Sequence, residues 1–224
     1  KSLDIGYKEN DELGGYDPYS ASKAASEIAI SSWKSSFCGK ESFQTSNLGI
    51  ATVRAGNVIG GGDWAKNRII PDSIKALINN EPVKVRSPES TRPWQHVLEP
   101  ISGYLILAKK IFEIGSYENI YTSPFNFGPR QQDNRSVLYM VKEILKYWPG
   151  EYLISLNVNA KHESKKLNLQ IDKANNLLKW YPIWSFSFAI ERTIKWYKNF
   201  NEGKSAMDCC KSDFISFWDS KIEN

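Results

Sequence analysis

The chain has 224 residues, 41% of them hydrophobic and 24% charged, which is enough apolar material for a packed core. Its net charge of +4 comes from basic residues interspersed with acidic ones, without a basic block, and this argues against nucleic acid as a partner. Three cysteines lack a metal-ligand spacing and the apolar runs are too short to cross a membrane, so we expect a cytoplasmic protein without structural zinc and without a membrane partner.

A helix is predicted to follow the polar N-terminal residues. Asp17 can cap its first turn, and Pro18 fits the first helical position because its missing N–H has no helical partner there. Apolar residues at helical spacing carry the pattern to Trp33, and we expect the helix to end before Gly39.

Short apolar segments alternate with helical patterns along the rest of the chain. We expect strands at 48–54, 83–86, 120–128 and 167–171. We expect helices at 71–78, from about 99 to 112, and at 137–147, 172–179 and 186–200. Helices that alternate with short apolar strands predict an α/β fold.

The glycine run Gly60-Gly61-Gly62 is a weak candidate for a phosphate-binding loop. No helix follows it directly, and the Lys-Ser/Thr pair of such loops is missing. The pattern therefore favours a flexible crossing between domains.

Tyr19 and Lys23 are candidate catalytic residues, because a spacing of four places both side chains on one face of the first helix. A tyrosine hydroxyl is a poor base near neutral pH, and a neighbouring ammonium group stabilises its phenolate form. The pair can therefore serve as a general base. Taken alone, the same spacing also fits a surface tyrosine beside a solvated lysine.

The segment around this pair resembles the active-site helix of the extended short-chain dehydrogenase/reductases. The similarity rests on Gly14-Gly15-Tyr16-Asp17-Pro18 followed by Tyr19-Ser20-Ala21-Ser22-Lys23. It continues through 54–60 and 125–128, which resemble later strands of the family's Rossmann domain. The stretch 91–100, Thr-Arg-Pro-Trp-Gln-His-Val-Leu-Glu-Pro, is similar to the nucleotide-sugar 4,6-dehydratases that act on CDP-glucose.

This resemblance implies an incomplete NAD(P)-binding Rossmann domain with a smaller mixed α/β substrate-binding lobe. Residues 1–60 and 97–130 would supply the later strands and helices of the Rossmann domain. Residues 61–96 and 131–224 would form the lobe that binds the nucleotide sugar. No apolar strand with a Gly-rich turn opens the chain, and the family's acid/base tripeptide is expected upstream of Lys1. We therefore expect this chain alone to be inactive and to bind NAD weakly.

The resemblance also implies a reaction and its cofactor. NAD would be reused within the dehydration of CDP-glucose to CDP-4-keto-6-deoxyglucose, a lyase reaction. Tyr19 would take the proton of the C4 hydroxyl, and Lys23 would support Tyr19 and hold the nicotinamide ribose. Two copies are expected to pair as a homodimer through the helix that contains Tyr19, and the product would serve O-antigen biosynthesis.

Five further side chains are expected at the substrate by the same resemblance. Arg92 would bind the pyrophosphate, Asn57 and Asn126 would face the sugar or phosphate, and Trp94 and Gln95 would shape the nucleotide pocket. Without the flanking motifs, Arg92 would be a solvated charge and the asparagines would be turn or strand-end residues. His96 and His162 are more typical of structural hydrogen-bonding groups than of catalysts.

Two other functions stay open. A nucleotide-sugar epimerase or decarboxylase of the same superfamily is disfavoured by the stretch around Arg92. A non-catalytic nucleotide-sugar-binding scaffold is disfavoured by the intact Tyr19 and Lys23, and favoured by the missing Gly-rich turn.

Overall fold

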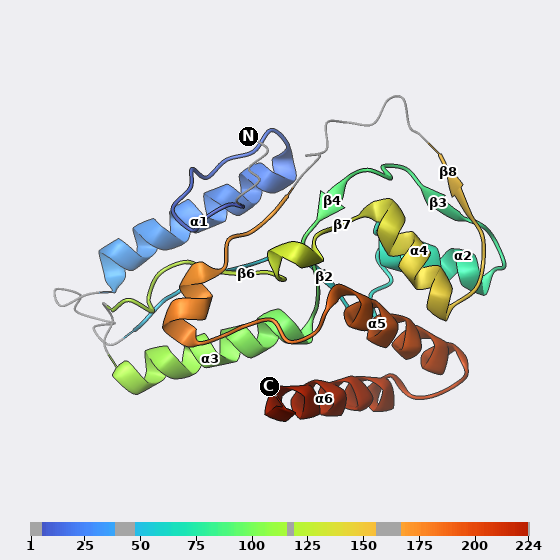
Figure 1. The fold of residues 1–224 in the computed structure, drawn as a ribbon. Coiled ribbons are helices and arrows are strands. Elements are labelled where there is room, and N and C mark those ends of the chain that lie inside the picture. Colours follow the sequence, from blue (N-terminus) through green and yellow to red (C-terminus); the bar gives the residue numbers. More distant parts are fainter. Residues whose placement is uncertain (1–5, 39–47, 116–118, 156–166, 224) are drawn as a thin grey trace.

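The computed structural model describes residues 6–38, 48–115, 119–155 and 167–223 (Figure 1). Its α-helices are α1 (Pro18–Phe37), α2 (Ile69–Ile78), α3 (Leu98–Ile114), α4 (Val137–Tyr147), α5 (Phe186–Asn201) and α6 (Ala206–Glu223). Its strands are β1 (Val53–Ala55), β2 (Asn57–Ile59), β3 (Val83–Val85), β4 (Thr91–Arg92), β5 (Trp94–His96), β6 (Phe125–Phe127), β7 (Arg135–Ser136) and β8 (Tyr152–Ile154). A 3-10 turn, η1 (Gln131–Asp133), and a π-helical turn, η2 (Ala174–Leu178), complete the described elements.

The strands associate in four pairs. Strands β1 and β6, β2 and β5, and β3 and β8 run parallel, whereas β4 and β7 run antiparallel. Figure 1 shows α1 on one side of β6 and α3 on the other. Parallel strands with helices on both sides confirm the predicted α/β class.

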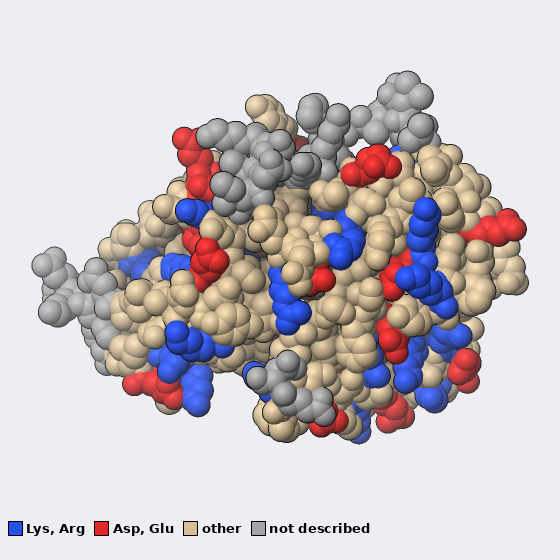
Figure 2. Space-filling view, in the orientation of Figure 1, with Lys and Arg blue, Asp and Glu red and all other residues tan. Residues whose placement is uncertain are grey.

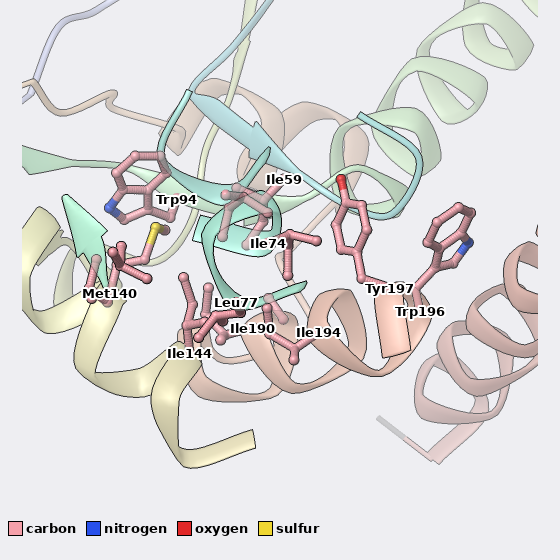
Figure 3. Close-up of a cluster of buried hydrophobic side chains, with 14 of the residues drawn as sticks. Ile59, Ile74, Leu77, Trp94, Met140, Ile144, Ile190, Ile194, Trp196 and Tyr197 are labelled. Atoms are coloured by element: carbon pink, nitrogen blue, oxygen red, sulfur yellow. The ribbon is translucent and has the colours of Figure 1, made fainter. Parts of the chain in front are cut away.

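The larger hydrophobic core lies between α2, α4 and α5 and is closed by β2, β3 and β5. Ile74, Met140, Ile144, Ile190 and Ile194 are fully buried at its centre, and Figure 3 shows them converging from the three helices. These residues recur at helical spacing on one face of each helix, which is why the sequence pattern located all three helices.

A smaller core joins α3, β6 and η2. Phe127 is fully buried, and its ring meets Tyr104 and Trp180 edge to face at centroid distances of 5.3 and 5.0 Å. A Cβ at Gly103 would lie 2.2 Å from the Phe127 ring, so only glycine allows α3 to approach β6 this closely. Residues of η2, with Trp180, thereby pack directly against α3 and β6, which come earlier in the chain.

The glycine run after β2 is a close-packed turn. A Cβ at Gly61 would lie 2.0 Å from the Trp196 ring of α5, and Gly62 has φ +86°, a backbone conformation that favours glycine. This packing and this backbone conformation account for the glycines, and no phosphate ligand is needed to explain them.

Several elements differ from the sequence expectations. Strand β1 begins at Val53 and not near residue 48. In place of the helix expected at 172–179 there is the π-helical turn Ala174–Leu178, and the 167–171 segment contributes one bridge, between Leu169 and Tyr7. The sequence pattern missed β2, β4, β5, β7, β8 and α6. The division into a Rossmann part and a substrate lobe stays a prediction. Within the described segments, no helix is both long and apolar enough to cross a lipid bilayer.

Candidate active site

Tyr19 and Lys23 lie together at the exposed start of α1. The Asp17 side chain caps the helix, as predicted, by accepting hydrogen bonds of 3.0 Å from the backbone N–H groups of Tyr19 and Ser20. The Tyr19 side chain is 73% exposed, and the Lys23 Nζ atom lies 5.7 Å from the centroid of its ring. The structure thus places a phenol and an ammonium group side by side and open to a ligand.

Glu27 anchors α1 to β1 and was not identified from the sequence. Its carboxylate accepts hydrogen bonds from Thr52 Oγ1 at 2.7 Å and from Arg54 Nε at 2.8 Å. Burial acts to raise its pKa, but the bonds from Arg54 and Thr52 outweigh this and hold the pKa below its usual range. Glu27 stands one turn after Lys23 on the same helix face, and this i+4 position was the available signal.

Asn57 and Arg92 are neighbours through the backbone. Strands β2 and β5 pair in a register that sets Asn57 beside Trp94, and the Asn57 N–H donates to the Pro93 carbonyl at 3.0 Å. Arg92 is half-buried, and its Nη1 donates to the Thr91 carbonyl at 2.8 Å. The Asn57 amide and the Arg92 guanidinium therefore lie at the same edge, where the chain passes from β1 to β2.

Trp94 and Gln95 lie beneath this edge, in the interior. Trp94 is 7% exposed and belongs to the larger core, and its indole Nε1 donates to the Arg135 carbonyl at 3.2 Å. Gln95 is 3% exposed and donates through Nε2 to the Phe127 carbonyl at 2.8 Å. In this conformation both residues support the edge from below.

Asn126 is likewise enclosed, with 1% of its surface exposed. Its Nδ2 donates to the carbonyls of Tyr7 and Gln170 at 3.0 and 3.3 Å, and its backbone N–H donates to Glu9 Oε1 at 2.9 Å. The Oδ1 atom is buried without a hydrogen-bond partner among the described residues. The structure thus packs Asn126 under the N-terminal segment.

Five of the seven predicted site residues therefore gather at one place, the carboxyl ends of β1 and β6. The Phe127 carbonyl accepts both Gln95 Nε2 and the Gly56 N–H, which links the two strand pairs. In parallel α/β sheets this end of the strands is where ligands bind. Tyr19 and Lys23 are on the helix that Glu27 fixes to the same strand, and Figure 1 shows that the N-terminal end of α1 points toward β4.

Two buried titratable groups follow Gln95 in the sequence. Burial, with the nearby Arg192 charge, lowers the pKa of His96 to about 3, and its Nδ1 accepts from the Leu98 N–H, which fits a structural role. Burial raises the pKa of Glu99 to about 7, although its Oε1 accepts the N–H groups of Ile183 and Trp184 at 2.9 and 2.6 Å. His162 lies outside the described residues.

The residues of this site fall in a segment that matches a known family. The model of the "NAD dependent epimerase/dehydratase family" matches residues 4–122, which is more than half of the chain. The chain belongs to this family. The match includes Tyr19, Lys23, Asn57 and Arg92, and it extends over α1 to α3.

Family members with curated functions include several sugar-nucleotide dehydratases. The chain is 41% identical over 215 residues to CDP-glucose 4,6-dehydratase of Salmonella typhimurium, and this match covers 94% of the chain and 59% of that protein. It is 23% identical over 208 residues to dTDP-D-glucose 4,6-dehydratase of Mus musculus, covering 92% of the chain and 54% of that protein. The chain thus spans between half and three-fifths of the length of these two relatives.

Solved structures of the family share the fold described above. The dTDP-glucose 4,6-dehydratase of Bacillus anthracis, in complex with NAD, matches 88% of the chain with a TM-score of 0.68 at 20% identity, over 57% of its own length. The Streptomyces venezuelae dTDP-glucose 4,6-dehydratase matches 87% of the chain with a TM-score of 0.70 at 17% identity, over 55% of its own length. At these identities the likeness shows the fold alone.

Proposed function

We propose that this protein catalyses the NAD-dependent dehydration of CDP-glucose to CDP-4-keto-6-deoxyglucose. The observation that carries the proposal is the accessible Tyr19–Lys23 pair in a chain that is 41% identical to a CDP-glucose 4,6-dehydratase over 215 residues. The exposed phenol and ammonium are the groups that such chemistry needs at the sugar C4 hydroxyl.

Tyr19 acts as the base for the C4 hydroxyl of the glucose. Its side-chain oxygen takes the hydroxyl proton, and Lys23 lies on the same helix face, with its Nζ atom 5.7 Å from the centroid of the Tyr19 ring. Oxidation at C4 makes the C5 proton acidic, and water then leaves across C5 and C6. When bound, NAD supplies the hydride chemistry at C4 and C6.

Tyr19 and Lys23 also fit one end of the cofactor. Both are exposed on the first turns of α1, so a hydroxyl and an ammonium can reach the ribose hydroxyls of a nicotinamide nucleotide together. Among the described residues, the glycine run after β2 packs against Trp196 and α2 begins only at Ile69, so this run does not form a strand–turn–helix cradle for the cofactor's phosphates. The residues present therefore fit the nicotinamide ribose.

We assign substrate binding to the edge formed by Asn57 and Arg92. The Arg92 guanidinium suits a pyrophosphate because it can make two parallel charge-assisted hydrogen bonds. Asn57 offers an amide beside it, and Asn126, Trp94 and Gln95 support the proposal as the buried layer that holds this edge in place.

The variant Tyr19→Phe tests the catalytic assignment. In the natural-length protein we expect kcat for CDP-glucose to fall by a factor on the order of 10²–10⁴, because the general base is removed, with little change in CDP affinity. Tyr16→Phe is the matched control, since Tyr16 is fully exposed three residues earlier. Equal kcat values for the two variants would show that Tyr19 is not the general base.

Cytoplasmic location, homodimer formation and a role in O-antigen biosynthesis are part of the same proposal. Their support is the 41% identity over 215 residues to the CDP-glucose 4,6-dehydratase of Salmonella typhimurium. Cell fractionation, sedimentation analysis and the deoxysugar content of lipopolysaccharide in a deletion strain test them separately.

A further inference from the structure

Two arginines face each other across the antiparallel pair β4–β7. The register sets Arg92 opposite Arg135 and Thr91 opposite Ser136. Residues directly opposite in such a pair project from the same face with Cβ atoms about 5 Å apart, and like charges there are destabilising. Figure 2 shows positively charged side chains at the surface where β4 and β7 lie in Figure 1.

The amino end of α4 adds to this positive potential. Ser136 is its N-cap and accepts the Tyr139 N–H, so the cap of the helix immediately follows Arg135. The first turn contains no acidic residue, although acidic residues are the ones that a helix amino end favours. Two arginines paired across β4 and β7 and a helix amino end therefore lie close together in the fold, an arrangement that an anion stabilises.

The Arg135 side chain is held in place with one edge unused. Its Nη1 donates to the carbonyls of Gln132 and Asn134, and its Cζ lies 5.3 Å from the centroid of the Tyr139 ring. Among the described residues, no acidic side chain pairs with Arg135, and no contact uses its Nε or Nη2. These two nitrogens form the edge of a guanidinium that grips two phosphate oxygens at once.

We infer that Arg135 is a second arginine of the pyrophosphate site and contacts the diphosphate of the nucleotide sugar opposite Arg92. This inference rests on the proposed function and adds a binding residue that the sequence motifs did not single out. Trp94 supports the arrangement from below, because its indole Nε1 fixes the Arg135 carbonyl at 3.2 Å. A preorganised guanidinium loses little freedom on binding, so its contribution should appear as affinity for the diphosphate.

Binding measurements on the natural-length protein with CDP, cytidine and inorganic pyrophosphate test this inference. For Arg135→Gln we expect the Kd for CDP and for pyrophosphate to rise about tenfold or more, and the Kd for cytidine to stay within about twofold. Lys142→Gln is the matched control, because Lys142 is an exposed cation on α4, the helix that follows Arg135. The control should bind all three probes as the wild type does.

Each outcome separates the inference from the function it rests on. If Arg135→Gln binds CDP and pyrophosphate as tightly as Lys142→Gln, the inference is wrong even where CDP-glucose is turned over. If Arg135→Gln does not fold, Arg135→Lys replaces it: an intermediate Kd for CDP supports the guanidinium contact, and a wild-type Kd overturns it. If the wild type prefers another nucleoside diphosphate, the proposed substrate fails, and the same variants test Arg135 with that ligand and with pyrophosphate.

Discussion

Asn126 fastens three segments together at the carboxyl end of β6. It donates to the Tyr7 and Gln170 carbonyls, so Asn126→Ala removes the side-chain donor of both acceptors, of which the Tyr7 carbonyl still accepts the Gln170 N–H. We expect the free energy of unfolding to fall by about 1–3 kcal/mol in urea denaturation. The exposed Asn201→Ala should change it by less than about 0.5 kcal/mol. Equal stabilities for the two variants would show that the Asn126 amide is dispensable to the fold.

Glu99 should make the stability of the protein depend on pH. Its pKa is about 7 in the fold because of burial, and about 4.3 in an unfolded chain. Between these values the folded protein binds more protons, so the free energy of unfolding falls as pH rises from about 5 to about 7. His96 has a lowered pKa of about 3 and acts oppositely, since its neutral burial costs stability as pH falls below about 6.5.

The variant Glu99→Gln isolates the Glu99 contribution, because His96 is the same in both proteins. Relative to the wild type, the variant should gain about 1–3 kcal/mol in free energy of unfolding between pH 5 and pH 8, as it carries no titrating carboxyl. Urea denaturation at a series of pH values measures this difference. Parallel pH profiles for the two proteins would mean that Glu99 ionises in the fold as it does in water.

Local motifs revealed some site residues, whereas others depend on distant partners. Tyr19 and Lys23 could be predicted because a helix fixes the geometry of residues four apart. The buried environment of Glu99 could not be predicted, because it depends on Ile183 and Trp184, more than eighty residues away. Arg135 was missed for the same reason, since its alignment with Arg92 arises only when β4 and β7 pair.

At the scale of elements, α6 is held to α5 by a buried ion pair. Arg192 Nη2 lies 2.7 Å and Nε 3.0 Å from Asp213 Oδ1, and both residues are less than a tenth exposed. Removing one partner of such a pair leaves an uncompensated buried charge, which costs about 3–5 kcal/mol.

Asp213→Asn should therefore strongly destabilise the packing of α6. We expect a loss of about 3–5 kcal/mol in the free energy of unfolding, measured by urea denaturation. Asp219→Asn, at an exposed position of the same helix, should be nearly neutral. A similar small effect at both positions would show that the Arg192 charge finds another partner or solvent.

Elements with strong helical periodicity were located well by the sequence, and elements made by tertiary pairing were not. Helix α4 has the predicted bounds, and α5 extends one residue past them. Strand β5 follows Pro93 and lacks β-branched residues, so only its pairing with β2 makes it a strand. Helix α6 was missed although Ser205 and Asp208 form a capping pair at its start, in which the Asp208 N–H donates to Ser205 Oγ at 3.1 Å.

At the scale of the whole molecule, the chain leaves an apolar groove beside β1. The groove has a volume of about 720 Å³ and runs between β1 and α3, where Val53, Tyr104, Leu107 and Ile111 line it. Phe112 next to it is 86% exposed. The match to the Salmonella typhimurium relative covers 59% of that protein's length. Activity is therefore best tested on the protein at its natural length.

The most direct test of the account is the fate of CDP-glucose labelled with deuterium at C4. Incubated with NAD and the natural-length protein, it should yield a product lighter by one water, with the deuterium at C6 when examined by mass spectrometry and NMR. Tyr19→Phe should form this product at least about a hundredfold more slowly. A product of unchanged mass would contradict the assignment as a 4,6-dehydratase.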